Sequence, residues 1–533
     1  MKKMIIAALI AAPAAAQAPG PAETATRAAI ARVMALNPKV NAVLALDPTA
    51  IDQARALDRM RRTRGALFGM PILIKDNIES AGPLPTTAGS LALAANVTGR
   101  DAPLVTRLRS AGAVILGKTN LSEWANIRSE ASISGWSGIG GQVRNPHALD
   151  RTPCGSSSGS GAAVAAGMVD AAIGTETDGS VTCPAAINGI VGLKPTVGLV
   201  SRTHVVPISH SQDTAGPMTK DVRTAALVLG AIAGSDPADA QTAEADKHRT
   251  DYAAALDANA LQGVRIGVMR FTTGWSATTD AFFEKALAVL KTKGAVLVEV
   301  EAPKDRAKIG PAEFQVLLSE LKADLNAYLA TTPASVKVRT LADAIAFNDA
   351  HAARELGLFG QDTFIKAEAT RGLADKVYID ARAQSLKGAK DALDTMLAKS
   401  SVVALVGITA SPAWPIDAVL GDQSPGGGAG SLAAVAGYPH LTVPMGAVRG
   451  LPVGLSFIGP AWSEAKLLGL GYAYEQASHA RVTPTFAASV ETVPAVAALL
   501  GRPDALTLPH PSGYGPLPLP RRKRGCISHL VPS

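Results

Sequence analysis

The chain has 533 residues, with 51 Lys or Arg against 44 Asp or Glu, and its formal net charge is +7. Because 47% of the residues are hydrophobic and only 18% are charged, the composition excludes a disordered or fibrous protein and provides for a large buried core. Aromatic residues make up only 4% and do not alternate with the basic ones, so we expect no nucleic-acid partner.

The N-terminus has the pattern of an export signal. Lys2 and Lys3 precede an apolar run from Met4 to Ala16, and small residues follow it. The run has 13 residues, well below the roughly 20 that span a bilayer, so we expect no stable membrane insertion. We predict a signal peptide over residues 1–18 and a periplasmic or secreted protein. An uncleaved membrane anchor or a misassigned start codon is the alternative.

Residues 19–490 are predicted to form one large α/β domain, because short apolar runs alternate with helical periodicity. Early helices are expected at 25–35 and 51–61, strands at 71–74 and 113–116, and a strand, helix, strand series at 264–268, 281–291 and 295–300. Later strands are expected at 402–406, 440–443 and 453–458. Residues 311–398 show almost wholly helical patterns and predict a cap-like segment within the domain.

The C-terminal residues 491–533 are predicted to be a mobile, proline-rich basic tail. Six prolines fall between residues 503 and 520, and four basic residues follow at 521–524. Proline at this density disfavours regular structure. These four residues, with Lys2 and Lys3, account for six of the seven net positive charges. The body of the chain is therefore close to neutral, which gives no general reason for a polyanionic partner.

Three cysteines, Cys154, Cys183 and Cys526, are too few for a disulfide framework. One bridge, for example between Cys154 and Cys183, would be allowed in an oxidising compartment. The sequence leaves the pairing open.

Two segments rich in glycine and hydroxyl residues, 153–161 and 174–180, are candidates for the chemistry. Each lies within apolar sequence and not within polar low complexity, which argues against flexible linkers. A helix is predicted at 162–168 directly after the first segment, so backbone N–H groups of that segment could point at an anion or oxyanion.

Two motif matches near these segments fail on physical grounds. Residues 112–119 fit the phosphate-loop pattern letter for letter, yet the four residues between its glycines are Ala-Val-Ile-Leu and favour a buried strand, so we expect no nucleotide site. Residues 155–159 fit the G-x-S-x-G elbow with Ser157 at its apex. That elbow needs a strand running into it, and residues 145–153 are polar with two prolines, which excludes an α/β-hydrolase elbow.

A reactive serine needs a base, and Lys75 is the best candidate. None of the nine histidines lies in either segment, and His204 and His210 are the nearest to the second. Lys75 follows the apolar run 71–74, so it is expected at a buried strand end, where burial lowers a lysine's pKa toward the range of a general base. The alternative is a strand-end lysine paired with a carboxylate. We find no H-E-x-x-H or paired C-x-x-C, so we expect no metal and no other cofactor.

Lys75 lies within residues 69–77, and the two Gly/Ser segments follow it. Their serines Ser156 and Ser180 are 24 residues apart. This arrangement resembles the amidase signature family. Further segments agree with this resemblance, which extends over about residues 33–480: GAVILGKTNLSEWA at 112–125, GIVGLKPTVGL at 189–199, DTAGPM at 213–218 and GLPVGLSFIG at 450–459. The resemblance implies a single domain in which helices cover a mixed, twisted β-sheet.

The same resemblance implies roles for the residues. Ser180 would be the acyl-forming nucleophile and Lys75 the base. Ser156 would bridge them after a cis peptide bond, here Gly155–Ser156, and water would hydrolyse the acyl-enzyme. The protein would thus be a serine amidohydrolase. The oxyanion hole would be formed by the N–H groups of four consecutive residues, Thr177, Asp178, Gly179 and Ser180.

The chain departs from the common family pattern at four positions, Glu176, Asp178, Thr182 and Ser158. These departures resemble the peptide amidase branch, which removes the C-terminal carboxamide from peptides. Three further segments point the same way: NLSEW at 120–124, SISGW at 132–136 and PAWPID at 412–417. We therefore expect a peptide amide or another small-molecule amide as substrate. An aryl or aliphatic amidase or esterase with the same catalytic residues is one alternative, and a non-catalytic periplasmic binding protein is another.

Overall fold

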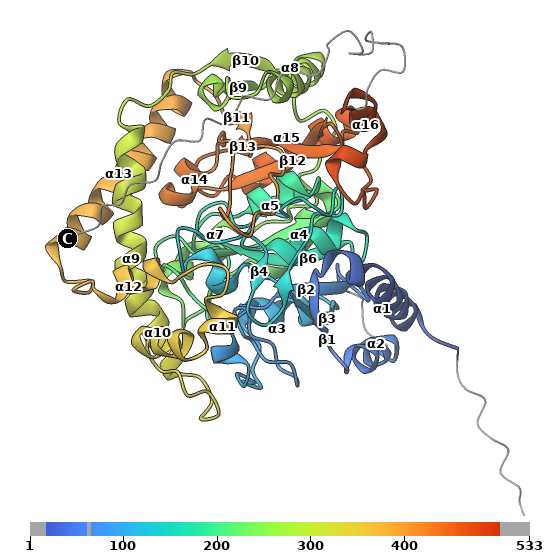
Figure 1. Ribbon diagram of the computed structural model, residues 1–533. Coiled ribbons are helices and arrows are strands. Elements are labelled where there is room, and N and C mark those ends of the chain that lie inside the picture. The colour runs from blue at the N-terminus through green and yellow to red at the C-terminus, as the bar shows by residue number, and fades with distance from the viewer. Residues whose placement is uncertain (1–17, 61–64, 501–533) are drawn as a thin grey trace, which may run out of the picture.

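The computed structural model describes residues 18–60 and 65–500, and a β-sheet of 11 strands forms its centre (Figure 1). The strands of this sheet are β1 (Val43–Leu46), β2 (Pro71–Lys75), β3 (Val114–Thr119), β6 (Ala171–Glu176), β7 (Val191–Lys194), β8 (Thr214–Thr219), β9 (Arg265–Val268), β10 (Val296–Glu299), β11 (Ala404–Ile408), β12 (His440–Val448) and β13 (Leu451–Ile458). Their spatial order is β1-β3-β2-β6-β8-β7-β12-β13-β11-β9-β10, and β4 (Trp136–Ser137) pairs separately with β5 (Gly141–Gln142). The β3-β2-β6 and β11-β9-β10 groups are parallel and the other neighbours are antiparallel, so the sheet is mixed, as predicted.

Helices cover both faces of the sheet. Residues of β2 alternate between the two cores: Ile72 and Ile74 pack on one face and Leu73 on the other. The first core is covered by α3 (Pro103–Ser110), α6 (Val222–Ile232), α8 (Ala277–Thr292) and α15 (Glu464–Ser478), and the second by α1 (Pro21–Val40), α2 (Ala50–Asp58), α4 (Ser158–Ala165) and α5 (Thr182–Ile187). The remaining short helices outside the predicted cap are α7 (Ala245–His248), α14 (Ser431–Ala436) and α16 (Pro494–Leu500). This double covering explains why strands near the centre, such as β6, β7, β8 and β13, are buried along their whole length.

The segment predicted to be helical at 311–398 forms five helices that lie along one side of the molecule (Figure 1). They are α9 (Arg306–Ala330), α10 (Leu341–Ala350), α11 (Ala352–Glu355), α12 (Asp362–Glu368) and α13 (Lys376–Lys399). The long helices α9 and α13 pack against each other, and α13 also packs on α14.

Three strands of the centre, β6, β7 and β8, have no counterpart in the sequence prediction. The β6 sequence AAIGTE lacks the run of branched residues that indicates a strand, and it is buried along its whole length. The helix predicted at 162–168 begins earlier, at Ser158, inside the first Gly/Ser segment. The rejection of the phosphate loop is confirmed, because its apolar residues form the buried strand β3.

Both predicted terminal segments extend beyond the described residues. The signal peptide over 1–18 lies outside them except for residue 18, and so do residues 501–533 of the predicted tail. The tail was expected to begin at 491, but a 3-10 turn (Val490–Thr492) and helix α16 continue the regular structure to Leu500. Among the described residues, no helix combines the length and the apolar character needed to cross a membrane.

Candidate active site

Two adjacent parallel strands bring the candidate residues to one edge of the sheet. Lys75 is the last residue of β2, and Glu176 is the last residue of β6. The two strands are in parallel register, with Ile74 opposite Ile173. Since parallel neighbours end at the same edge, Lys75 lies beside the start of the segment 177–180, and the carboxyl ends of strands are where α/β sheets bind ligands.

Lys75 is wholly buried and contacts uncharged oxygen atoms. Its Nζ donates to Ser156 Oγ at 2.7 Å, to Thr175 Oγ1 at 2.8 Å and to the Thr175 carbonyl at 3.3 Å. None of the ion pairs among the described residues includes Lys75, so the alternative of a lysine paired with a carboxylate is wrong. Burial lowers the pKa of Lys75 to about 7, with Asp213 and Glu176 opposing the shift. A large share of the amine is therefore uncharged at neutral pH.

Ser156 is also wholly buried and follows a cis peptide bond with Gly155, as the family resemblance implied. Its carbonyl accepts from the Ser122 N–H at 3.1 Å. A Cβ on Gly155 would lie 2.1 Å from Ser122 Oγ, so a larger residue at this position would have to displace the Ser122 side chain. The next residue, Ser157, donates its N–H to the Ser180 carbonyl at 3.1 Å, which joins the two Gly/Ser segments.

Ser180 ends the segment 177–180 and has an exposed fraction of 8%. Within the described part of the chain, the backbone N–H groups of Asp178, Gly179 and Ser180 have no protein acceptor. Neighbouring side chains hold the segment: Thr177 Oγ1 donates to Asp213 at 2.6 Å, and Gln212 Nε2 donates to the Thr177 carbonyl at 3.4 Å. The N–H groups of this segment are thus positioned and available for an oxyanion.

The departures from the common family pattern contact one another or the catalytic segments. The Glu176 carboxylate accepts from the N–H groups of Val181 at 2.7 Å and Thr182 at 2.9 Å, and from Thr182 Oγ1 at 3.2 Å. Burial raises the pKa of Asp178 to about 6, and the neighbouring Ser431 hydroxyl opposes this shift. Ser158 Oγ donates to the Cys154 carbonyl at 2.6 Å. Glu176 and Thr182 therefore hold the residues that follow Ser180, and Ser158 holds the residues that precede Ser156.

The histidines nearest to the second segment are used elsewhere. His210 Nδ1 lies 2.9 Å from Asp324, and His204 lies 4.0 Å from Glu79. No described histidine hydrogen-bonds Lys75, Ser156 or Ser180. His210, Glu320 and Asp324 have potential metal-ligand atoms within 4.8 Å of one another. Glu320 also accepts hydrogen bonds from Ser209 and Ser211, so the cluster is explained by contacts within the protein.

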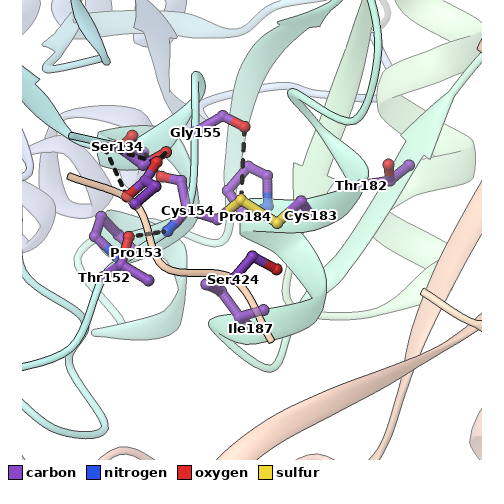
Figure 2. The surroundings of a disulfide bond; sticks show 12 residues. Ser134, Thr152, Pro153, Cys154, Gly155, Thr182, Cys183, Pro184, Ile187 and Ser424 are labelled. Atoms are coloured by element: carbon purple, nitrogen blue, oxygen red, sulfur yellow. Dashed lines mark hydrogen bonds between the residues drawn. A yellow bond between two sulfur atoms is a disulfide. The ribbon is translucent and has the colours of Figure 1, made fainter. Parts of the chain in front are cut away.

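A disulfide bond joins Cys154 to Cys183, the pairing that the sequence left open (Figure 2). It connects the residue before Gly155 to the second residue of α5. Cys526 lies outside the described residues.

Comparison with known proteins decides the family. The family model named Amidase matches residues 24–468. The chain belongs to this amidase family. A protein named "Probable amidase" from Arabidopsis thaliana is 38% identical over 467 residues, covering 85% of this chain and 86% of the relative.

Solved structures agree. The native peptide amidase from Stenotrophomonas maltophilia is 51% identical, with a TM-score of 0.82, over 87% of this chain and 95% of that one. A complex of peptide amidase PAM with the competitive inhibitor chymostatin is 52% identical, with a TM-score of 0.84, over 87% and 96%. The amidase described here is thus an amide-hydrolysing enzyme with the single large mixed α/β domain that the sequence predicted.

In this amidase, the three segments that suggested the peptide amidase branch surround the Gly155–Ser156 peptide. Ser122 Oγ accepts from the Gly135 N–H at 2.8 Å, and the Thr152 N–H donates to the Trp414 carbonyl at 2.9 Å. The Asp422 carboxylate links two of the segments, because it accepts from the Ser134 N–H and from Trp414 Nε1. These three segments therefore pack around the Gly155–Ser156 peptide and hold it in place.

Three polar residues around the site were not predicted from the sequence. Thr175 accepts a hydrogen bond from Lys75, Asp213 accepts one from Thr177, and Gln212 donates one to the Thr177 carbonyl. Thr175 lies in the second Gly/Ser segment and Asp213 in the DTAGPM motif, so both stood within recognised sequence signals. The contacts of the three residues span 35 to 100 positions of sequence and depend on the pairing of β2, β6 and β8.

Proposed function

We propose that this amidase hydrolyses the C-terminal carboxamide of peptides through a relay from Ser180 through Ser156 to Lys75. The observation that carries the relay is the 2.7 Å hydrogen bond between the wholly buried Lys75 Nζ and Ser156 Oγ. An uncharged amine can donate its two N–H groups to the oxygens of Thr175 and accept the Ser156 hydroxyl proton on its lone pair.

In the first half-reaction, Ser180 Oγ attacks the carboxamide carbon while its proton passes to Ser156 and the Ser156 proton passes to Lys75. The carbonyl oxygen gains negative charge and is held by the N–H groups of residues 177–180. The C–N bond then breaks, the relay returns a proton to the nitrogen, and ammonia leaves an ester on Ser180. In the second half-reaction the same relay deprotonates water, which attacks the ester and releases a peptide carboxylate.

A groove beside the oxyanion segment supports a substrate with a long acyl part. Its volume is about 620 Å³, in the range of sites that bind compounds much larger than a simple amide. Two of its lining residues lie near the oxyanion segment: Ser431 is a neighbour of Asp178, and Glu313 accepts a hydrogen bond from Gln212, which also donates to the Thr177 carbonyl. Apolar side chains that would contact substrate side chains form much of the remaining wall: Phe271, Ile309, Ala429 and Leu432.

Filling this groove should separate long substrates from short ones. Gly310 lies in the groove wall on α9, and an added Cβ there meets no atom within 4 Å. We expect Gly310→Phe to raise KM for a tripeptide amide by about tenfold, with little effect on a single amino-acid amide, because only the longer acyl part extends along the groove. Gly360→Phe is the matched control, since Gly360 also has open space around its Cβ and lies outside the groove.

Ammonia release by the wild type over a panel of amides, with ester hydrolysis followed in parallel, tests the substrate class. We expect peptide amides to give the highest kcat/KM. If simple aryl or aliphatic amides or esters react as fast or faster, the peptide assignment is wrong and the enzyme is a general amidase or esterase. Equal KM changes for long and short amides in Gly310→Phe would remove the groove from the acyl site.

We also propose that the enzyme acts in the periplasm or outside the cell. The basic and apolar pattern of residues 1–18 supports this, and so does the disulfide, since such bonds persist in oxidising compartments. Expression of the full chain in a bacterial host, followed by fractionation and N-terminal mass spectrometry, should find a shortened chain outside the cytoplasm. An intact N-terminus on a cytoplasmic enzyme would contradict the proposal.

A further inference from the structure

We propose that the Cys154–Cys183 disulfide is a positioning bond of the active site, which holds the Ser156 segment in place against the oxyanion segment. The inference rests on the serine relay proposed above. Cys154 precedes Ser156 by two residues, and Cys183 follows Ser180 by three. The bond spans 29 residues of sequence, and the loop that it closes contains both serines, α4 and β6.

Neither serine segment lies in a strand or a helix, and helix-type hydrogen bonds hold only the ends that run into α4 and α5, such as the Gly161 N–H to the Ser157 carbonyl. Residues 152–157 lie before α4 without regular structure, and residues 177–181 lie between β6 and α5 in the same way. Their mutual position depends on a few contacts, such as the Ser157 N–H to the Ser180 carbonyl at 3.1 Å and Asn188 Nδ2 to the Pro153 carbonyl at 2.9 Å. The disulfide adds a covalent link between them.

Each end of the disulfide is connected to a group that acts in the proposed reaction. The Cys183 N–H donates to the Gly179 carbonyl at 2.8 Å, so Cys183 is tied to the oxyanion segment. On the other side, Cys154 is followed directly by the Gly155–Ser156 peptide. A displacement of either cysteine therefore moves the N–H donors relative to the serine that bridges to Lys75. Misplacement of reacting groups by about 1 Å can slow catalysis by about 100-fold.

The two cysteines of the bond differ in burial. Cys154 is buried in an apolar cluster with Ile187 and Trp414, whereas Cys183 is half-buried beside this cluster. Ser424, drawn in Figure 2 among the residues around the disulfide, belongs to an exposed stretch without regular structure. Cys183 is thus the more exposed of the two cysteines and the end at which we expect a small dithiol to attack.

Two independent routes remove the bond. Dithiothreitol transfers two electrons and two protons to it, giving two thiols on the enzyme and the cyclic disulfide of the reagent. The double variant Cys154→Ser/Cys183→Ser removes it without reagent, and if that variant does not fold, the reduced wild type still provides the test. Cys526→Ser is the matched control, because it removes the third cysteine and keeps the bond. Thiol counting and melting temperature accompany each sample.

We expect loss of the bond to lower kcat on a peptide amide by about 10- to 100-fold, with KM changed by less than about threefold. The acid limb of the pH profile should also move to higher pH, because loosened segments admit water to Lys75, whose charged neighbours are Asp213 and Glu176. Reoxidation should restore the wild type and Cys526→Ser, and dithiothreitol should not affect the double variant. A role in stability alone would lower the melting temperature and leave kcat and the acid limb in place.

The proposal is overturned if kcat stays within about twofold of the wild type, or if the acid limb does not move, once thiol counting shows the bond open. This outcome differs from failure of the relay itself. If the relay is wrong, Ser180→Ala keeps its activity in the oxidised enzyme, whatever the disulfide does.

Discussion

Replacement of Ser180 by alanine is expected to lower kcat on a peptide amide by about 10⁴- to 10⁶-fold, the loss that follows removal of a serine nucleophile. Without Ser180 Oγ no acyl-enzyme can form, and only the oxyanion N–H groups and substrate binding remain. Ammonia release measures the loss, and a fluorophosphonate probe should label the wild type and not the variant. The melting temperature should hardly change, because Ser180 Oγ makes no hydrogen bond within the described residues.

Ser110→Ala serves as the control, since Ser110 lies on the exposed face of α3 and its hydroxyl bonds only the Thr106 carbonyl. It should match the wild type in turnover and labelling. Near-wild-type turnover by Ser180→Ala would disprove the assignment of the nucleophile.

Replacement of Lys75 by methionine should lower kcat/KM by about 10²- to 10⁴-fold, the range of a general base. Methionine fills nearly the same buried volume and leaves Ser156 without a proton acceptor. Lys194→Met is a matched control for the loss of a buried lysine, because Lys194 is also wholly buried at the end of a central strand and donates to the Pro195 carbonyl, with Glu176, Glu464 and Asp178 as charged neighbours. The kcat/KM of Lys194→Met should fall far less than that of Lys75→Met. Comparable losses in the two variants would mean that any buried lysine matters here and that Lys75 is not the base.

The pH profile of the wild type gives a second test of Lys75. Its pKa is lowered to about 7 by burial, and the uncharged form is the base, so kcat/KM should decline as the pH falls through about 7. The same pKa shift determines how the stability of the fold changes with pH. A lysine whose pKa is depressed by folding destabilises the fold at pH below that pKa, and the penalty disappears as the pH rises toward 10.5, the ordinary value. Lys75→Met should therefore melt at the same or a higher temperature than the wild type at pH 7 and below.

The candidate active-site residues could be named from the sequence because the family motifs are local. Lys75, Ser156 and Ser180 each stand in a short run whose neighbours are unusual in composition, and the order and spacing of the runs identified the family. The helical character of residues 311–398 also followed from the sequence, because long amphipathic helices carry their pattern in every turn. The burial of Lys75 was expected from its place after an apolar run of four residues.

The contacts that make the site work are decided by the tertiary structure. The strand β6 carries Thr175 onto Lys75, yet its small residues show no strand pattern, because helices on both faces determine its conformation. The Cys154–Cys183 bond could not be assigned from three cysteines, since the pairing depends on how two irregular segments meet. By itself, the sequence determined the family, the fold class and the candidate catalytic residues. Only the sheet order, which joins residues up to 100 positions apart, decided how a buried amine meets Ser156 and how the serine segments are held together.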